Sequence, residues 1–154
     1  MSRTSAPAQR IVVAVGLPGS GKSTYFRRRR LNPLSSDALR RTLADNEDDQ
    51  TIHTHVFATL QYLLRRRIRI GRPVTYVDAT HLSPAERRPY LDIGARYGCQ
   101  VEAVFFDVPV EVCKQRNRRR RRMVPDAVID AMAARLAPPT LEEGFAAVQV
   151  VRGC

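Results

Sequence analysis

The sequence has little cysteine, few aromatic residues, no tryptophan and only two lysines among 154 residues. Its three cysteines, Cys99, Cys113 and Cys154, form no C-x-x-C pair, so they encode neither a disulfide framework nor a zinc site. The longest apolar run, residues 11–15, is far too short to cross a bilayer, and the first ten residues lack the apolar core of a secretory signal. We therefore expect a soluble protein of the reducing cytoplasm.

Arginine is what the sequence has in excess. There are 26 basic against 15 acidic residues, a formal net charge of +11 at pH 7, and every basic residue except Lys22 and Lys114 is an arginine. Such a chain attracts polyanions, with nucleic acid, nucleotide phosphates and anionic membranes as candidates. Arginine and alanine also accumulate through GC-rich coding, so composition alone does not choose among these partners.

Predicted strands alternate with predicted helices along the chain. The β-branched run at residues 11–15 is typical of a strand buried on both faces, and it ends at a glycine-rich turn. We expect strands at residues 11–15, 34–35, 74–77, 101–106 and 147–151, and helices at residues 22–30, 37–43, 51–69, 84–97, 111–122 and 126–136. This alternation predicts a flexible N-terminal arm (residues 1–9) and one α/β domain (residues 10–154) with a mostly parallel sheet of about five strands.

A phosphate-binding turn follows the first expected strand. Residues 16–23 read Gly-Leu-Pro-Gly-Ser-Gly-Lys-Ser, which fits G-x-x-x-x-G-K-[ST] between a strand and a helix. The glycines let backbone N–H groups face one concavity, Lys22 can reach the β- and γ-phosphates, and the Ser23 hydroxyl can hold Mg²⁺. Glycine-rich turns also serve packing alone, but the Lys-Ser pair favours a nucleotide. The expected nucleotide-binding residues are Gly16, Pro18, Gly19, Ser20, Gly21, Lys22, Ser23 and Thr24.

Two aspartates follow strands of the expected sheet. Asp37 comes after the second strand and Asp78 after the third. The carboxyl ends of parallel strands share one edge with the phosphate turn, so both side chains should line the ligand crevice. Either carboxylate could accept a proton from an attacking hydroxyl or hold Mg²⁺ through water. Asp37 could instead be only the N-cap of the next helix, and Asp78 only a turn residue.

Arginines crowd the end of the expected helix at residues 111–122. Arg116 and Arg120 are four residues apart and should share one face, from which their guanidinium groups could reach nucleotide phosphates. Cations also suit the carboxyl end of a helix, and that simpler interpretation applies to the outer members of the group. The group as a whole is Arg116, Arg118, Arg119, Arg120, Arg121 and Arg122.

The other charged runs are interpreted as surface. Residues 27–30 and 65–67 are consecutive arginines, so each run points around its helix and most members should face water. His53, His55 and His81 have no partner at the spacing of metal ligands, so we interpret them as ordinary polar residues.

Taken in order, these blocks resemble the P-loop polynucleotide 5′-kinase family, and most closely the kinase module of bacterial polynucleotide kinase-phosphatases. The resemblance covers most of residues 11–151. The phosphate-binding turn is common to all P-loop proteins, whereas the later blocks narrow the choice of family. These blocks are Ser35-Ser-Asp37 with Arg40, residues 48–51, Val77-Asp78-Ala-Thr80, and Phe106-Asp107-Val-Pro109 followed by Arg116-Asn117 and Arg120. One departure is His81, where the family commonly has Asn. Another is that the 154 residues include no phosphatase or ligase domain.

The resemblance implies a P-loop kinase fold, with helices on both faces of the sheet and an arginine-rich lid. It also implies an ATP- and Mg²⁺-dependent enzyme that transfers the ATP γ-phosphate to a DNA or RNA 5′-hydroxyl end. The expected partner is that nucleic acid end, with no membrane and no obligate protein partner.

The resemblance further implies roles for individual residues. Asp37 is the general base, and Ser23 coordinates Mg²⁺ with assistance from Asp78. The phosphates are steadied by Lys22, Arg116 and Arg120 at the nucleotide and by Arg40 at the acceptor. Two other functions stay open: a kinase for a small hydroxyl compound such as a sugar, nucleoside or antibiotic, and a nucleotide-dependent binding module without transfer chemistry.

Overall fold

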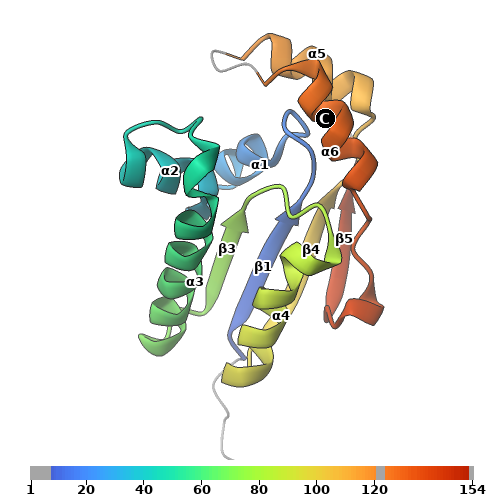
Figure 1. Ribbon diagram of the computed structural model, residues 1–154. Coiled ribbons are helices and arrows are strands. Elements are labelled where there is room, and N and C mark those ends of the chain that lie inside the picture. The colour runs from blue at the N-terminus through green and yellow to red at the C-terminus, as the bar shows by residue number, and fades with distance from the viewer. Residues whose placement is uncertain (1–7, 121–123, 153–154) are drawn as a thin grey trace, which may run out of the picture.

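A five-stranded sheet is the centre of the computed structural model of this chain (Figure 1). The structure describes residues 8–120 and 124–152. The strand order is β2-β3-β1-β4-β5 and every pairing is parallel, which confirms the predicted mostly parallel sheet. The strands are β1 (Arg10–Val15), β2 (Leu34–Ser35), β3 (Val74–Asp78), β4 (Gln100–Phe106) and β5 (Ala147–Val151).

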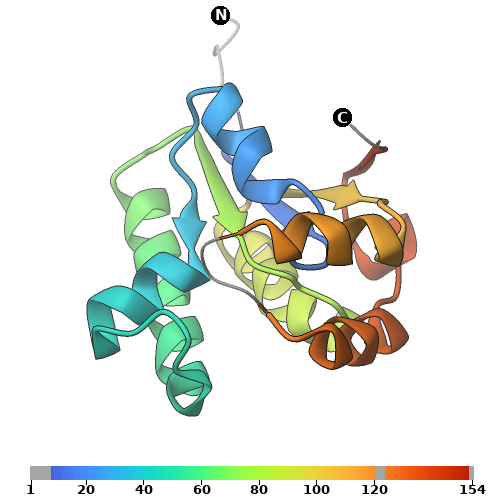
Figure 2. The ribbon, with the colours of Figure 1, turned by 90° about the horizontal axis from the view of Figure 1, so that it is seen from above.

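Helices cover both faces of the sheet, as predicted. The helices are α1 (Lys22–Arg28), α2 (Ser36–Ala44), α3 (His53–Arg69), α4 (Pro84–Tyr97), α5 (Val110–Arg118) and α6 (Asp126–Arg135), with 3-10 turns η1 (Gln50–Ile52) and η2 (Leu141–Glu143). The view from above shows α1 on one side of the strands and α3 with α4 on the other (Figure 2). Helices α5 and α6 lie beyond the carboxyl ends of the strands (Figure 1). No helix in the described part of the chain is both long and apolar enough to span a bilayer.

The alternation of side chains on β1 divides the core into two layers. Ile11, Val13 and Val15 pack in the cluster that includes the buried residues of α3 and α4. Val12 and Ala14 point to the opposite face, where they pack in the cluster that includes Phe26 of α1. The sheet is therefore buried on both sides, which is why β1 is a continuous apolar run.

The carboxyl ends of α1 and α5 differ from the prediction by two or more residues. Helix α1 ends at Arg28 rather than at residue 30, because Arg30 takes a left-handed backbone conformation (φ 55°) and the chain turns toward β2. Helix α5 ends at Arg118, so the predicted helix at residues 111–122 was too long. The start of α4 is as predicted: Pro84 occupies the first turn, and Ser83 and Glu86 form a reciprocal capping box.

A fully buried arginine fastens the C-terminal segment to α4. Arg87 is 0% exposed and makes a two-pronged ion pair with Glu143 of η2, at 2.9 and 3.0 Å. Its remaining terminal nitrogen donates to the carbonyl groups of His81, Leu82 and Ala137. One guanidinium group thus joins the loop after β3 to the segment between α6 and β5.

The amino-terminal end of the described chain is fixed to the sheet. Most of the expected arm, residues 1–7, lies outside the described residues. The Gln9 side chain donates to the carbonyl groups of Ile68 and Arg72, and its own carbonyl accepts from the N–H of Gln100. Regular structure begins directly afterwards, at Arg10.

Candidate active site

A cavity of about 1310 Å³ lies at the carboxyl edge of the sheet, between the phosphate turn, α2, the start of α3 and the α5–α6 region. It brings together most of the predicted site residues from four separate stretches of the chain. Gly16 and Ser20 do not line it: the Ser20 N–H donates to the Leu17 carbonyl, and its hydroxyl lies against Gly16. The predicted residues that do line it are Pro18, Gly19, Gly21, Lys22, Ser23, Thr24, Asp37, Arg40, Asp78, Arg116 and Arg120.

The phosphate turn depends on two glycines with left-handed backbone. Gly19 has φ 82° and Gly21 has φ 100°. A Cβ on Gly19 would stand 2.5 Å from the Cys113 carbonyl oxygen, so α5 lies directly against the turn at this position. A Cβ on Gly21 would stand 3.7 Å from Nη1 of Arg116, which places that guanidinium group beside the turn. Only glycine meets both requirements at Gly19.

Lys22 and Asp78 are two buried charged groups that line the cavity. The Lys22 ammonium donates to the carbonyl groups of Gly16 and Leu17, at 2.9 and 2.8 Å. Burial lowers the pKa of Lys22, although the nearby Asp78 carboxylate opposes that shift. Burial likewise raises the pKa of Asp78, against the effects of Lys22 and of the Ser23 hydroxyl. Both pKa shifts arise because burial removes water that would stabilise the charged form of each group.

Ser23 and Asp78 are suitable in chemistry for a magnesium ion. The Ser23 hydroxyl donates to Asp78 Oδ2 at 3.2 Å, so a hydroxyl and a carboxylate oxygen lie together beside Lys22. Residues 8–120 and 124–152 contain no group of three or more His, Cys, Asp or Glu that could hold a metal. Mg²⁺ differs from most metals because it usually takes one or two protein oxygens and completes its shell with water and phosphate.

Asp37 and Arg40 lie side by side at the other end of the cavity. Ser35, not Asp37, caps α2, because its hydroxyl accepts from the Ala38 N–H, so the interpretation of Asp37 as only an N-cap was wrong. Arg40 Nη1 donates to Asp37 Oδ1 at 3.3 Å, and its Nη2 lies 3.3 Å from His53 Nδ1. Arg40 is only 6% exposed, and its Nε has no hydrogen-bond partner within the described residues.

His53 is a functional candidate that the sequence pattern did not indicate. Because arginine can only donate, His53 Nδ1 must accept, which places the ring proton on Nε2 and leaves the ring neutral. Burial lowers the pKa of His53, and the Arg40 charge adds to this. The ring also packs on Phe57, with 4.6 Å between centroids. His53 starts the helix that follows the cavity edge, but nothing in its spacing revealed the contact with Arg40.

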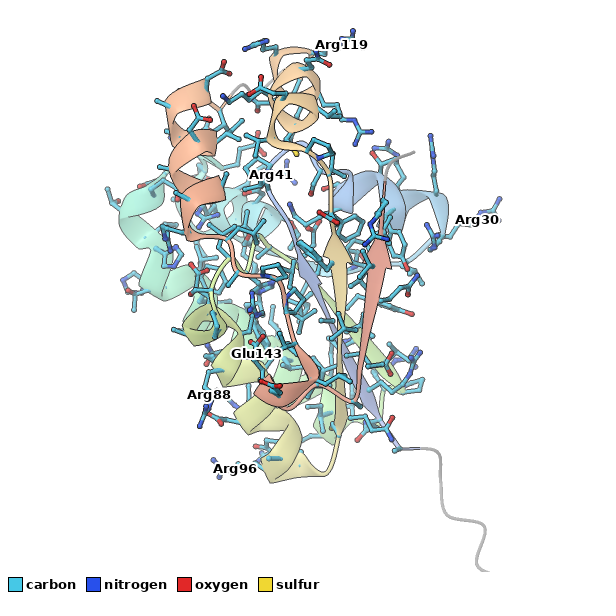
Figure 3. The ribbon with its side chains drawn as sticks, turned by 90° about the vertical axis from the view of Figure 1, so that its right-hand side faces the viewer. Arg30, Arg41, Arg88, Arg96, Arg119 and Glu143 are labelled. Atoms are coloured by element: carbon cyan, nitrogen blue, oxygen red, sulfur yellow. The ribbon has the colours of Figure 1, made fainter. Side chains whose placement is uncertain are left out.

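The α5–α6 region carries the predicted arginine-rich lid. The buried Asn117 side chain bonds both the N–H and the carbonyl group of Val124, which closes the loop between the two helices. Arg120 lies in this loop, beyond the end of α5, so the prediction that it shares a helical face with Arg116 was wrong. Both side chains nevertheless line the cavity, together with Arg119, which projects at the top of Figure 3. Arg121 and Arg122 lie outside the described residues.

The consecutive arginine runs were expected to face water for the most part, and three of their members also have other contacts. Arg27 and Arg28 line the cavity while remaining exposed. Arg67 is half-buried, and its guanidinium group donates to the Thr75 hydroxyl and the Val74 carbonyl, both at 2.9 Å.

Known proteins share this arrangement of turn, sheet and helices. Residues 11–139 match the AAA domain family across most of the chain. The chain belongs to that family. A bifunctional polynucleotide phosphatase/kinase from Schizosaccharomyces pombe is 24% identical over 149 residues, which are 93% of this chain and 33% of the relative. This AAA domain therefore spans about a third of that relative's length. Together these matches confirm the predicted P-loop, polynucleotide-kinase-like family.

Solved structures show the same fold. Kti12 from Chaetomium thermophilum, in complex with ADP-AlF3, has a TM-score of 0.68 at 15% identity, over 92% of this chain and 88% of that one. A sugar kinase from Janibacter sp. has a TM-score of 0.64 at 21% identity, over 95% of this chain and 86% of that one. These likenesses confirm the P-loop kinase fold of this AAA domain.

Proposed function

We propose that this AAA domain is an ATP-dependent kinase that phosphorylates the 5′-hydroxyl end of DNA or RNA. Arg40 is the observation that carries the proposal. Arg40 lines the cavity, is only 6% exposed and pairs with Asp37 at 3.3 Å, and its Nε has no partner among the described residues. An arginine held in this way at a cavity wall is well suited to bind an anionic ligand. A polynucleotide end offers Asp37 a hydroxyl and Arg40 a phosphate, whereas a neutral sugar offers only the hydroxyl.

The opposite end of the cavity supports binding of the donor nucleotide. The phosphate turn and Lys22 follow a motif that cradles the β- and γ-phosphates. ATP with Mg²⁺ supplies the transferable phosphoryl group and neutralises part of its charge. Ser23 and Asp78 would hold the ion, because their oxygens are the hard ligands that Mg²⁺ prefers.

In the transfer step, one residue of the chain accepts a proton and three others offset negative charge. Asp37 accepts the proton of the attacking hydroxyl as its oxygen bonds to the γ-phosphorus, while the bond from that phosphorus to the bridging oxygen breaks. Lys22, Arg116 and Arg120 line the cavity around the phosphate turn, where they would offset charge on the phosphate oxygens. Arg116 lies on α5 beside the turn, and Arg120 lies in the loop that Asn117 closes.

A kinase for a small hydroxyl compound is the second candidate. The sugar kinase from Janibacter sp. has the same fold, and a fold of this type serves many acceptors. The volume of the cavity and the buried Arg40 favour the larger, anionic acceptor.

Acceptor choice tests the proposal directly. The protein is incubated with γ-labelled ATP, Mg²⁺ and single-stranded DNA or RNA carrying either a 5′-hydroxyl or a 5′-phosphate, and in parallel with sugars and nucleosides. We expect label in the 5′-hydroxyl strands and none in the 5′-phosphorylated ones. Transfer only to a small compound would replace the proposal by the second candidate, and no transfer to any acceptor would favour a binding module.

A further inference from the structure

A groove between α3 and α4 leads away from the acceptor end of the cavity. The two helices lie side by side on one face of the sheet (Figure 1). Residues that are four apart in sequence lie on the same side of a helix. Five such residues follow one another along α3: His53, Phe57, Gln61, Arg65 and Arg69. The first three members line the cavity of the candidate active site, and the last two line a second hollow.

The second hollow lies further along the same two helices. It has a volume of about 430 Å³ and begins one turn beyond Gln61 of α3 and Pro89 of α4. Its walls are Arg65 and Arg69 from α3, and Asp92, Ile93, Arg96 and Tyr97 from α4. We call the surface from His53 to these residues the α3–α4 groove.

The far end of the α3–α4 groove is positively charged. Arg65, Arg69 and Arg96 make no ion pair within the described part of the chain, and Arg96 lies 5.7 Å from the Tyr97 ring centroid. Figure 3 shows Arg96 projecting outward from the end of α4.

Both acidic side chains that line the groove are already neutralised. Glu86 is paired with Arg135 at 3.0 Å, and Asp92 is paired with Arg88 at 3.4 Å. The three unpaired arginines therefore leave the far end of the groove complementary to an anionic chain.

We propose that the α3–α4 groove binds the stretch of single-stranded nucleic acid that follows the acceptor's 5′ end, an inference that rests on the proposed function. With the 5′-hydroxyl at Asp37 and the first phosphate at Arg40, the strand passes Phe57 and reaches Arg65, Arg69 and Arg96. The guanidinium groups of these three arginines bind the phosphates of the strand.

The length of the groove sets the length of strand that it holds. From His53 to Arg69, α3 rises about 24 Å at about 1.5 Å per residue. A stacked strand advances about 3.4 Å per nucleotide, so about seven nucleotides occupy the groove. Affinity should rise with acceptor length up to about this size and then level off.

A triple substitution, R65A/R69A/R96A, tests the groove, and R66A/R72A/R152A removes the same charge from exposed arginines elsewhere. Binding of a labelled single-stranded 20-mer is followed by fluorescence anisotropy across a salt series. For the groove variant we expect Kd to rise about tenfold and the slope of log affinity against log salt to fall by about 2, since each phosphate contact contributes about 0.7. For the control we expect a change of less than about twofold. Equal weakening of both variants, or wild-type binding by the groove variant, would overturn the proposal.

Activity on a short acceptor separates this proposal from the proposed function. A nucleoside 3′-monophosphate reaches Asp37 and Arg40 but not the three arginines at the far end of the groove. The groove variant should therefore phosphorylate it with the wild-type kcat and KM, while its KM for the 20-mer rises about tenfold. An unchanged KM for the 20-mer would overturn the groove alone. Absence of transfer to either acceptor by the wild-type protein would overturn the proposed function, and the anisotropy experiment would still decide whether the groove binds a strand.

Discussion

His81 is a buried polar residue on which the position of the phosphate turn depends. Its ring is 2% exposed, with Nδ1 lying 2.6 Å from the Ala14 carbonyl oxygen and Nε2 lying 2.9 Å from the Tyr90 hydroxyl. The carbonyl oxygen can only accept, so Nδ1 carries the proton and Nε2 accepts from Tyr90. The ring thus joins β1, just before the turn, to α4. Sequence patterns presented it as an ordinary polar residue because both partners are distant along the chain.

The stability of the protein should depend on pH through His81. Burial lowers its pKa from 6.5 to about 4, so the folded state favours the neutral ring. The stabilisation is complete above pH 6.5 and is lost as the pH falls toward 4, by about 3 kcal/mol at about 1.36 kcal/mol per pKa unit. Urea unfolding of wild type and His81→Asn at pH 7 and pH 4.5 measures this. We expect the variant to lose about 2 kcal/mol less on acidification.

His81→Asn should also lower stability at pH 7, by about 1–3 kcal/mol, because the shorter side chain cannot bond both partners. Burial raises the pKa of Asp78, so this carboxyl group stabilises the fold on acidification and acts in the opposite direction, equally in both proteins. Identical pH dependence in wild type and variant would contradict the role given to His81.

Gly19 allows a matched test of the phosphate turn. Gly19 and Gly71 both have left-handed backbone, with φ 82° and 85°, so alanine at either costs about 1–2 kcal/mol in conformation. Only at Gly19 would the new Cβ collide, 2.5 Å from the Cys113 carbonyl oxygen, whereas nothing lies within 4 Å at Gly71. Calorimetric titration with a non-hydrolysable ATP analogue should show binding weakened at least tenfold by Gly19→Ala and unchanged by Gly71→Ala. Equal affinities of the two variants would contradict the described turn.

For helices, strands and turns, the sequence correctly predicted the features that depend on neighbouring residues. The β-branched run of β1, the glycine-rich turn and the capping box at Ser83 each depend on neighbouring residues, and the structure confirms all three. The ends of α1 and α5 were predicted wrongly, and for α1 the cause is the left-handed backbone of Arg30. For α5, Asn117 bonds the backbone of Val124 and so closes the chain into a loop where the composition still favours a helix.

The candidate site was predictable to the same degree. Lys22 and Ser23 belong to one contiguous motif, and Asp78 follows from its place at a strand end. The contact between Arg40 and His53 joins residues 13 apart, and the pair of Arg87 and Glu143 joins residues 56 apart. No periodicity along the chain encodes such contacts. A buried arginine therefore cannot be distinguished from an exposed one in the sequence.

The buried ion pair between α4 and η2 should contribute strongly to stability. Removing Arg87 leaves the Glu143 carboxylate and three carbonyl groups without their donor, so Arg87→Ala should reduce the free energy of unfolding by about 3–5 kcal/mol. Arg88→Ala is the control, because its pair with Asp92 is 73% and 69% exposed and should contribute at most about 1 kcal/mol. Urea denaturation of both variants measures the difference. Losses of similar size would contradict this assignment.

Across the whole molecule, the arginines that give the net charge of +11 have three different roles. Arg67, which is half-buried, and Arg87, which is fully buried, stabilise the fold through hydrogen bonds between elements. Arg40 and Arg116 face the cavity at its two ends. The remaining excess is concentrated on exposed helix faces, where the arginines of the α3–α4 groove are proposed to bind a strand. The three uses imply different responses to salt, since buried pairs are screened far less than exposed charge.

The proposed kinase holds a phosphate donor at Lys22 and an acceptor hydroxyl at Asp37 in one cavity. This arrangement is tested by the rate of label transfer from ATP to a 5′-hydroxyl oligonucleotide by wild type and Asp37→Asn, with ATP affinity measured in parallel. Asp45→Asn, at the far end of α2 and outside the cavity, is the matched control. We predict that Asp37→Asn slows transfer by about 10²–10⁴-fold and changes ATP affinity less than about threefold, while the control transfers at the wild-type rate. Transfer by Asp37→Asn at the wild-type rate would contradict this arrangement.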